Sequence, residues 1–169
     1  MIRFATVHTK YGWVGLVGSE AGLIVLTLPK SSRKAALSEI KESAADAVED
    51  TSAFSDLPDR LRRYFNGENV SFSDKLGLDG ASPFDRAVWK ATVAIPYGET
   101  RSYAWVAQQI GRPRACRAVG GALARNPFPI IVPCHRVVAS SGSLGGFGGG
   151  LALKQRLLGQ ESGRLRVLS

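Results

Sequence analysis

The first 80 residues alternate short apolar runs with turn-forming residues, a pattern typical of strands joined by tight turns. Residues 4–7, 13–17 and 23–26 are apolar runs with the length and β-branched content of short strands. Gly18 to Gly22 separates the second run from the third, and this segment favours a hairpin turn. We therefore predict three short strands, the last two of which form a hairpin.

Two helices are predicted after these strands. Apolar residues at helical spacing predict the first helix from Lys34 to Val48. Residues 57–65 predict the second, which ends at Asn66-Gly67 because these two residue types commonly terminate helices. The first half of the chain thus reads as an α+β module, and no group of its residues suggests chemistry.

A domain boundary is predicted at Gly77 to Ala81, which gives a first domain of residues 1–80 and a second of residues 81–169. The second domain opens at Ser82-Pro83, where a capping hydroxyl precedes a proline at the first helical position. Asp85 follows in the first turn, and its charge suits the positive end of the helix dipole. These residues predict a well-defined helix start.

A helix-turn-helix pattern follows a break at residues 95–98. Ser102 is a capping residue for a short helix at 103–110, residues 111–113 form a turn, and a second helix is predicted at about 114–124. Its predicted apolar stripe consists of Ala115, Ala118, Val119, Ala122 and Leu123.

Three residues of the second helix lie off that stripe, namely Arg114, Arg117 and Gly121. Basic and very small residues on an outer face allow a helix to lie close to a phosphate backbone. Many helical hairpins share this pattern, so on its own it indicates DNA binding only weakly.

Charge divides the chain into two unlike halves. Residues 1–80 carry 10 Lys and Arg against 11 Asp and Glu, a net charge of −1, whereas residues 81–169 carry 12 against 3, a net charge of +9. A basic domain beside a neutral one suggests a polyanion as partner, usually nucleic acid, although a basic surface can also serve solubility alone.

The composition is that of a globular protein and argues against several kinds of site. No run approaches the roughly 18 apolar residues of a membrane span, and the first residues lack a secretory signal, so we expect a cytoplasmic protein that does not bind membranes. Two cysteines, Cys116 and Cys134, are too few for a disulfide framework. The two histidines lack metal-ligand spacing, so we expect no metal and no cofactor.

Residues 126–138 contain three prolines and predict a stiff approach to Cys134, with residues 130–132 extended and buried. A free thiol has a pKa of about 8.5, so nucleophilic work needs a base or a positive field. His135 and Arg136 follow directly, but neighbouring side chains of an extended segment point to opposite faces. We therefore expect a water, not a direct bond, between Cys134 and His135. By itself this dipeptide is also compatible with a buried core cysteine.

The wider sequence contains a specific set of motifs around this thiol. Pro-Cys-His-Arg at 133–136 follows Ile-Ile-Val, and further motifs stand at Ile95–Gly98, Ser102-Tyr103, Arg117–Ala122, Asn126-Pro127 and Gly148–Ala152, with Lys154 and Glu161. Over roughly residues 82–161 this set resembles the O6-alkylguanine-DNA alkyltransferases. Residues 1–80 resemble that family's variable N-terminal domain only in size and strand pattern. We expect a small sheet-plus-helix domain followed by a mainly helical, winged helix-turn-helix-like domain.

The resemblance implies a reaction, in which an alkyl group moves irreversibly from O6-alkylguanine in double-stranded DNA to Cys134. His135, through a water, would take the thiol proton, and Glu161 would orient His135 and favour its charged form. Asn126 would hold the backbone around the site, and Tyr103 would stabilise the leaving guanine. The thioether is stable and no second thiol or cofactor is implied, so the protein would act once, as a monomer.

The resemblance also implies a surface for the DNA and a pocket for the extruded base. Arg117 would fill the gap left by the base, and the Gly148 amide would meet its O6 atom. The implied DNA-binding set is Arg117, Tyr103, Arg114, Ala118, Gly121 and Arg125. The implied substrate-binding set is Val137, Phe147, Gly148 and Lys154, and the carbonyls of Cys134 and Val137 would read the base edge.

Two positions depart from the family's pattern. Phe147 stands where several relatives have tyrosine, and Gly148 stands where some have serine, so two hydroxyls are absent from the pocket rim. Two other functions fit this sequence less well than alkyl transfer. A lesion sensor or regulator would bind DNA without transfer, but such sensors lack the cysteine that is present here. A cysteine hydrolase would need a second histidine, and His8 precedes the motif in the other domain.

Overall fold

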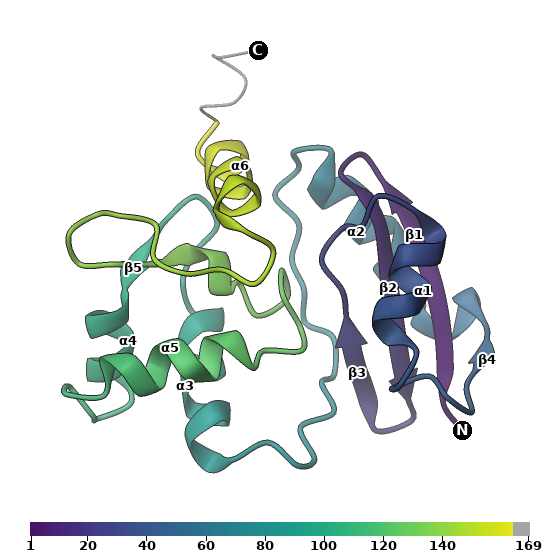
Figure 1. Ribbon diagram of the computed structural model, residues 1–169, viewed down its shortest axis with the longest axis horizontal. Helices are drawn as coiled ribbons and strands as arrows, with labels where there is room; N and C mark the ends of the chain where they lie inside the picture. Colours follow the sequence, from purple (N-terminus) through teal and green to yellow (C-terminus); the bar gives the residue numbers. More distant parts are fainter. Residues whose placement is uncertain (164–169) are drawn as a thin grey trace. The chain divides into compact units, whose positions relative to one another are not determined.

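The computed structural model describes residues 1–163 and divides them into two units, one of residues 1–79 and one that begins at Gly80 (Figure 1). The first unit contains a sheet with helices, and the second is mainly helical. This confirms the predicted α+β fold class, with a sheet domain followed by a helical domain.

The sheet of the first unit has four strands in the order β3-β2-β1-β4. Strands β1 (Arg3–Thr9), β2 (Gly12–Ser19) and β3 (Gly22–Leu26) pair antiparallel, which confirms the three predicted strands and the hairpin. The short strand β4 (Val48–Glu49) pairs in parallel with β1 at the edge.

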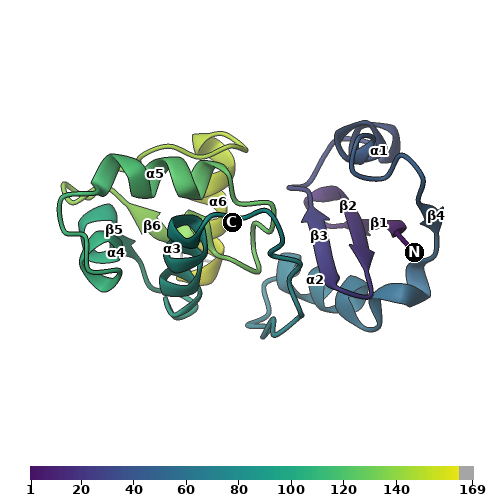
Figure 2. The ribbon, with the colours of Figure 1, turned by 90° about the horizontal axis from the view of Figure 1, so that it is seen from below.

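Helices cover both faces of this sheet. Helix α1 (Arg33–Ile40) lies on one face and α2 (Leu57–Phe65) on the other, with the short 3-10 helix η1 (Thr51–Phe54) before α2 (Figure 2). The central strand β2 is therefore buried along consecutive residues instead of at alternate ones. Gly15 in this strand allows the close approach of α1, because a Cβ there would lie 2.9 Å from the Ile40 side chain.

The helix predicted at residues 34–48 is correct only in its first half. Helix α1 ends at Ile40, and the chain then turns before Val48 and Glu49 join the sheet. The Val48 amide donates to the Ile2 carbonyl at 3.1 Å, so the open edge of β1 provides the backbone partner that a longer helix would have provided. A long-range partner of this kind is not visible in local helical spacing.

Four α-helices and a small sheet form the described part of the second unit, residues 80–163. The helices are α3 (Pro83–Val93), α4 (Tyr103–Gln109), α5 (Cys116–Ala124) and α6 (Leu151–Glu161). Strands β5 (Arg101–Ser102) and β6 (Val137–Val138) pair in parallel, and the 3-10 helix η2 (Cys134–Arg136) immediately precedes β6. Within residues 1–163, none of the helices has both the length and the apolar character needed to cross a membrane.

Helix α3 anchors the core of this unit. Ser82 caps it as predicted, since its hydroxyl accepts a hydrogen bond from the Asp85 amide at 3.0 Å. Trp89 is buried, donates from Nε1 to the Ala122 carbonyl at 2.9 Å, and packs edge-on against Phe128. This tryptophan thus ties α3 to α5 and to the segment that leads to Cys134.

Helices α4 and α5 form the predicted helix-turn-helix, with two corrections. Helix α5 begins at Cys116, so Arg114 lies in the turn before it, because Pro113 and the bond from the Ala115 amide to the Arg112 carbonyl hold that segment as a turn. Ala118 is exposed and does not belong to the buried stripe, because α3 and α4 cover only the side of α5 that carries residues such as Val119.

Candidate active site

A tight turn places Cys134. Pro133 has φ −78° and ψ 66°, and the Cys134 amide donates to the Val132 carbonyl at 2.7 Å, which is an inverse γ-turn. Asn126 braces the preceding loop, because its Oδ1 accepts from the Phe128 amide at 2.9 Å and its Nδ2 donates to the Val132 carbonyl at 3.0 Å. The thiol therefore stands on a backbone fixed by proline and by one asparagine side chain.

The extended conformation predicted before Cys134 is wrong. Residues 130–132 are buried, but Ile130 has φ +76°, a conformation that β-branched residues rarely adopt, and the chain turns there. The Val132 amide donates to the Phe128 carbonyl at 2.8 Å, and this bond closes the turn. Residues 134–136 are likewise a 3-10 turn, so consecutive side chains diverge by its rotation and not by strand alternation.

The environment of the thiol acts on its ionisation in two directions. Burial raises the pKa of Cys134 above its ordinary value, because it penalises the thiolate. A hydrogen bond from Asn126, the positive charge of Lys154 and two backbone amides lower the same pKa. Cys134 itself is partly exposed. The resting thiol is thus predominantly protonated, while groups that stabilise a thiolate are already in place.

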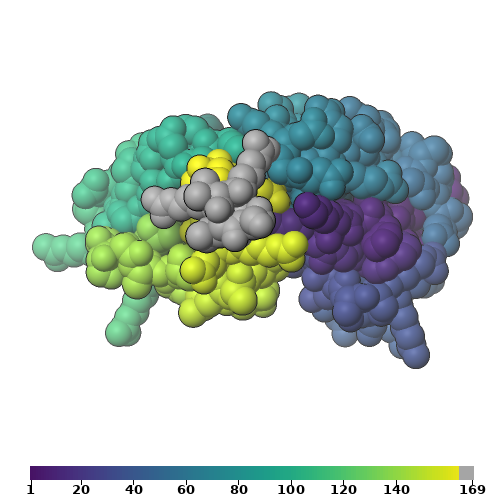
Figure 3. Space-filling model, turned by 90° about the horizontal axis from the view of Figure 1, so that it is seen from above, coloured from purple at the N-terminus to yellow at the C-terminus, as the bar shows by residue number. Residues whose placement is uncertain are grey.

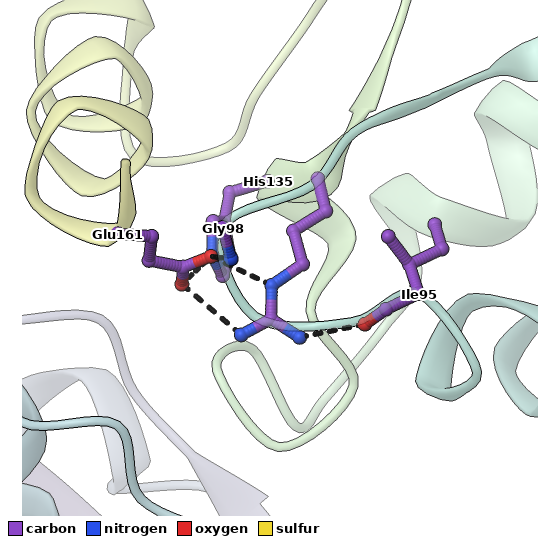
Figure 4. Close-up of polar contacts among 5 residues, drawn as sticks. Ile95, Gly98, His135 and Glu161 are labelled. Carbon is purple, nitrogen blue, oxygen red and sulfur yellow. Dashed lines mark hydrogen bonds and ion pairs between the residues drawn. The ribbon is translucent and has the colours of Figure 1, made fainter. Parts of the chain in front are cut away.

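His135 and Arg136 both contact Glu161 at the end of α6, and Figure 4 shows His135 beside the glutamate. The Nε2 atom of His135 lies 2.6 Å from Glu161 Oε2, and Arg136 donates from Nε to Oε1 at 2.7 Å. Arg136 also donates to the Ile95 carbonyl at 2.9 Å, and the Gly98 amide donates to Glu161 Oε1 at 3.4 Å. One buried carboxylate therefore joins η2, α6 and the segment between α3 and β5.

The pKa values of this group follow from its burial and pairing. Burial alone would raise the pKa of Glu161, but the hydrogen bonds and charges of His135 and Arg136 lower it to about 2. Burial lowers the pKa of His135 and outweighs the opposing effect of Glu161. Glu161 is therefore ionised and His135 is predominantly neutral near pH 7. With Nε2 bonded to the carboxylate, Nδ1 is the ring nitrogen that would accept a further proton.

Lys154 is a buried cation on α6. Its Nζ donates to the Val137 carbonyl at 2.7 Å and to the Gly146 carbonyl at 3.1 Å. It also lies 6.0 Å from the centre of the Tyr103 ring. Burial lowers the pKa of Lys154, and the nearby Cys134 opposes this shift. The lysine thus connects the thiol, the strand after it and the glycine-rich loop at residues 139–150.

Tyr103 at the start of α4 packs against this loop. A Cβ at Gly145 would lie 2.6 Å from the tyrosine hydroxyl, so only glycine allows the loop to approach this closely. Burial raises the pKa of Tyr103, and a hydrogen bond with the Gly146 backbone partly opposes it. Phe147 is half-buried and Gly148 is exposed on the same loop, whose yellow-green surface adjoins α6 in Figure 3.

The outer face of α5 carries the candidate DNA-binding residues. Arg117 and Ala118 are exposed, Gly121 is half-buried, and Arg114 is exposed in the turn before the helix. Gly120 connects this helix to the thiol site, because a Cβ there would lie 3.9 Å from the Tyr103 ring. The structure thus brings Cys134, Asn126, Tyr103 and Lys154 together and pairs His135 with Glu161. It places Arg117 on the adjoining helix and Arg114 in the turn before it.

Comparison with known proteins places this geometry in a family. Residues 83–163 match the DNA-binding domain of 6-O-methylguanine DNA methyltransferase, and residues 2–79 match the ribonuclease-like domain of the same protein family. The chain belongs to the 6-O-methylguanine DNA methyltransferases.

Relatives in this family match over nearly the whole chain. The methylated-DNA–protein-cysteine methyltransferase of Mycolicibacterium paratuberculosis is 44% identical over 95% of this chain and 93% of its own. That of Methanosarcina barkeri is 42% identical over 95% of this chain and 97% of its own. The crystal structure of Mycobacterium tuberculosis OGT in complex with DNA is 43% identical, with a TM-score of 0.80 over 96% of this chain and 94% of that one.

Sequence reasoning left some residues of this methyltransferase-like site without a role. The sequence indicates only that Arg136 neighbours the thiol, yet its side chain binds Glu161 and the Ile95 carbonyl. Its position in the Pro-Cys-His-Arg motif was the signal. The Ile95–Gly98 motif was matched without a role, and its backbone binds the same buried group. Among residues 1–163, no group of three or more His, Cys, Asp or Glu could hold a metal ion.

Proposed function

We propose that this protein repairs DNA by moving an alkyl group from O6-alkylguanine to Cys134 and keeping it there as a thioether. The observation that carries the proposal is the setting of the thiol. Cys134 is partly exposed, Asn126 and Lys154 stabilise its thiolate, and the neighbouring His135 is buried against Glu161. A nucleophile beside an oriented base is the arrangement that a displacement at carbon requires.

The reaction consists of a proton transfer from the thiol, one exchange of bonds at the alkyl carbon, and a proton transfer to the leaving guanine. The thiol proton of Cys134 passes, through a water, to Nδ1 of His135, and Glu161 stabilises the resulting imidazolium. The sulfur then forms a bond to the alkyl carbon as the bond from that carbon to guanine O6 breaks. The electron pair of the broken bond goes to guanine, whose anion takes a proton from the Tyr103 hydroxyl. Solvent then restores the tyrosine proton and takes up the proton that His135 had accepted.

The positions of Tyr103 and Lys154 support their roles in this scheme. Burial raises the pKa of Tyr103, so its hydroxyl remains protonated at neutral pH and can donate. Lys154 brings its positive charge near Cys134 and holds the Val137 carbonyl in place. We assign Val137, Phe147 and Gly148 to the pocket for the extruded base, since they lie on the segments that Lys154 and Tyr103 brace.

DNA recognition is assigned to the basic half of the chain. In this proposal residues 81–169 are the domain for DNA binding and transfer, and residues 1–80 are a separate α+β domain. Exposed Arg117 and Arg114 suit contact with phosphates and with the gap left by the base. The partner is double-stranded DNA that contains O6-alkylguanine, and the protein acts as a cytoplasmic monomer without a cofactor.

A pair of cysteine variants tests which thiol accepts the alkyl group. Cys134→Ala should abolish the loss of the methyl group from a duplex that contains O6-methylguanine, yet retain duplex binding, because α5 is unchanged. Cys116→Ala should keep most of the activity, since Cys116 lies at the start of α5. An inactive but folded Cys116→Ala would contradict the assignment. Binding of the lesion by the unmodified protein without loss of the methyl group would indicate a sensor instead.

A further inference from the structure

An ion pair at the end of α5 neutralises one of its candidate DNA-binding residues. Arg125 follows the last residue of the helix, and its guanidinium donates from Nε to Asp85 Oδ2 at 3.0 Å and from Nη2 to Oδ1 at 2.8 Å. The arginine side chain is 59% exposed, whereas the aspartate side chain is only 9% exposed. The pair is therefore a bidentate ion pair in which only the arginine faces solvent.

The position of Arg125 is on the outer face of α5. Arg117, Gly121 and Arg125 are spaced four residues apart and so lie along one side of the helix. A Cβ on Gly121 would lie 3.2 Å from Arg125 Nη1, which shows that the guanidinium folds back over this glycine. Arg125 thus lies beside Arg117 on the surface proposed for DNA.

Asp85 is well suited to hold that guanidinium. It stands in the first turn of α3, where its amide donates to the capping Ser82 hydroxyl at 3.0 Å. The hydrogen bond from Arg125 lowers the pKa of Asp85 despite its burial, so the carboxylate is ionised. A carboxylate and a phosphate offer an arginine fork the same pair of oxygen acceptors.

The other arginines of this surface are not held in this way. Neither Arg114 nor Arg117 forms an ion pair with another residue in the range 1–163. Their charges are available to a phosphate at once, whereas Arg125 must first leave Asp85. This surface therefore contains two arginines that are unpaired within the described residues, Arg114 and Arg117, and one arginine, Arg125, that is paired with Asp85.

We propose that Asp85 occupies Arg125 as an internal substitute for a DNA phosphate, so that Arg125 contacts DNA only by exchanging one anion for the other. The proposal rests on the DNA binding proposed above. Because the exchange breaks one strong contact to form another, Arg125 adds less affinity than its charge implies. Asp85 thereby weakens the binding of undamaged duplex DNA, which every repair protein meets in large excess.

A double-mutant cycle on undamaged duplex tests this exchange. The affinities of the unmodified protein, Asp85→Asn, Arg125→Ala and the double variant are measured between about 50 and about 200 mM salt. We expect Asp85→Asn to bind about three- to tenfold more tightly, with a salt slope steeper by up to about 0.9, the value of one phosphate contact. The released Arg125 then contacts a phosphate in every complex, whereas Asp85 retains it in part of the complexes of the unmodified protein. In the Arg125→Ala background, Asp85→Asn should change neither the affinity for duplex nor the salt slope.

A matched variant controls for net charge. Glu49→Gln removes one negative charge and releases Arg33 in the first unit, as Asp85→Asn does for Arg125 in the second. Glu49→Gln should leave the slope of log affinity against log salt unchanged. Thermal unfolding shows whether each variant is folded. If Asp85→Asn does not fold, Asp85→Gln takes its place, because glutamine is a neutral residue that is favoured at the third position of a helix after a serine cap.

Three results would overturn the proposal. An unchanged slope in Asp85→Asn would mean that Arg125 gains no phosphate contact when Asp85 releases it. An equal gain in the Arg125→Ala background would mean a general charge effect, as would an equal gain in Glu49→Gln. If the unmodified protein does not bind duplex at all, the proposed function itself fails, and this is known before any variant is compared.

Discussion

At the scale of single residues, Arg136 and His135 share the carboxylate of Glu161. The positive charge of Arg136 contributes to lowering the pKa of His135, which keeps the imidazole neutral and able to accept the thiol proton. Arg136 also fixes Glu161 to the Ile95 carbonyl, so it positions the base without touching substrate.

Replacement of Arg136 should therefore change the pH dependence of transfer. In Arg136→Gln the pKa of His135 should rise, so the single-turnover rate should begin to fall at a higher pH as the solution is made more acidic. Arg136→Lys retains the charge and should keep most of the unmodified profile. Rates measured from about pH 5 to about pH 8 would show the shift. Identical profiles for the unmodified protein and Arg136→Gln would exclude this role.

Glu161 should make the fold sensitive to acid. Its folded pKa of about 2 lies below the ordinary value of 4.5, so between these values the unfolded chain binds more protons and stability falls as the pH falls. Full protonation removes about 3 kcal/mol. The lowered pKa of His135 adds a loss of the same sign that begins near its ordinary value of 6.5.

Glu161→Gln provides the test of this linkage. Denaturant unfolding at a series of pH values should show a lower stability near pH 7 and a flatter dependence between pH 4.5 and about 2 than in the unmodified protein. Glu20→Gln, at an exposed carboxylate in the first unit, is the matched control. An unchanged acid dependence in Glu161→Gln would show that the carboxylate is not the stabilising partner.

At the scale of elements, local signals predicted those whose ends are set by their own residues. Helix α2 has the predicted bounds because Asn66 and Gly67 end it, and α3 and α4 start where Ser82 and Ser102 cap them. The wrong predictions depend on distant partners, namely β4 on the edge of β1 and the turn at Ile130 on the Phe128 carbonyl. The prolines before Cys134 indicate a stiff loop but not that the chain turns at Ile130.

Helix α5 should matter for duplex DNA more than for the chemistry. Arg117 is exposed on this helix and can fill the space of an extruded base. Arg117→Ala should slow repair of O6-methylguanine in duplex severely and slow reaction with free O6-methylguanine base far less, because the free base needs no extrusion. The ratio of the two rate losses, measured on one preparation, decides the matter. Equal losses would mean that Arg117 supports the fold or the thiol instead.

At the scale of the whole molecule, the two halves of the chain differ in net charge. Residues 1–80 carry a net charge of −1 and residues 81–169 a net charge of +9. This asymmetry predicts that DNA binds the second half, and the motifs from 82 to 161 predict the residues of the candidate site. Neither could predict the pairing of Asp85 with Arg125, since these residues are distant in sequence and meet only through the packing of α3 against α5.

The charge asymmetry predicts which half sets the salt dependence of DNA binding. Arg114→Gln should reduce the slope of log affinity against log salt by about 0.9, the value of one phosphate contact. Lys10→Gln, an exposed cation of the first unit, should leave it unchanged. Affinities for a short duplex across a salt series give both slopes. Equal reductions in the two variants would place part of the interface on the first unit.

The central claim is that Cys134 accepts the alkyl group and that the protein acts once. Its most direct test is the intact mass of the protein after mixing with excess duplex that contains O6-methylguanine, followed by fragmentation of the peptide around residue 134. We expect every molecule to gain a single methyl group in place of the thiol hydrogen, located on Cys134, and DNA repair to stop at one lesion per protein. An unmodified mass alongside repaired DNA, or a methyl group located on Cys116, would contradict it.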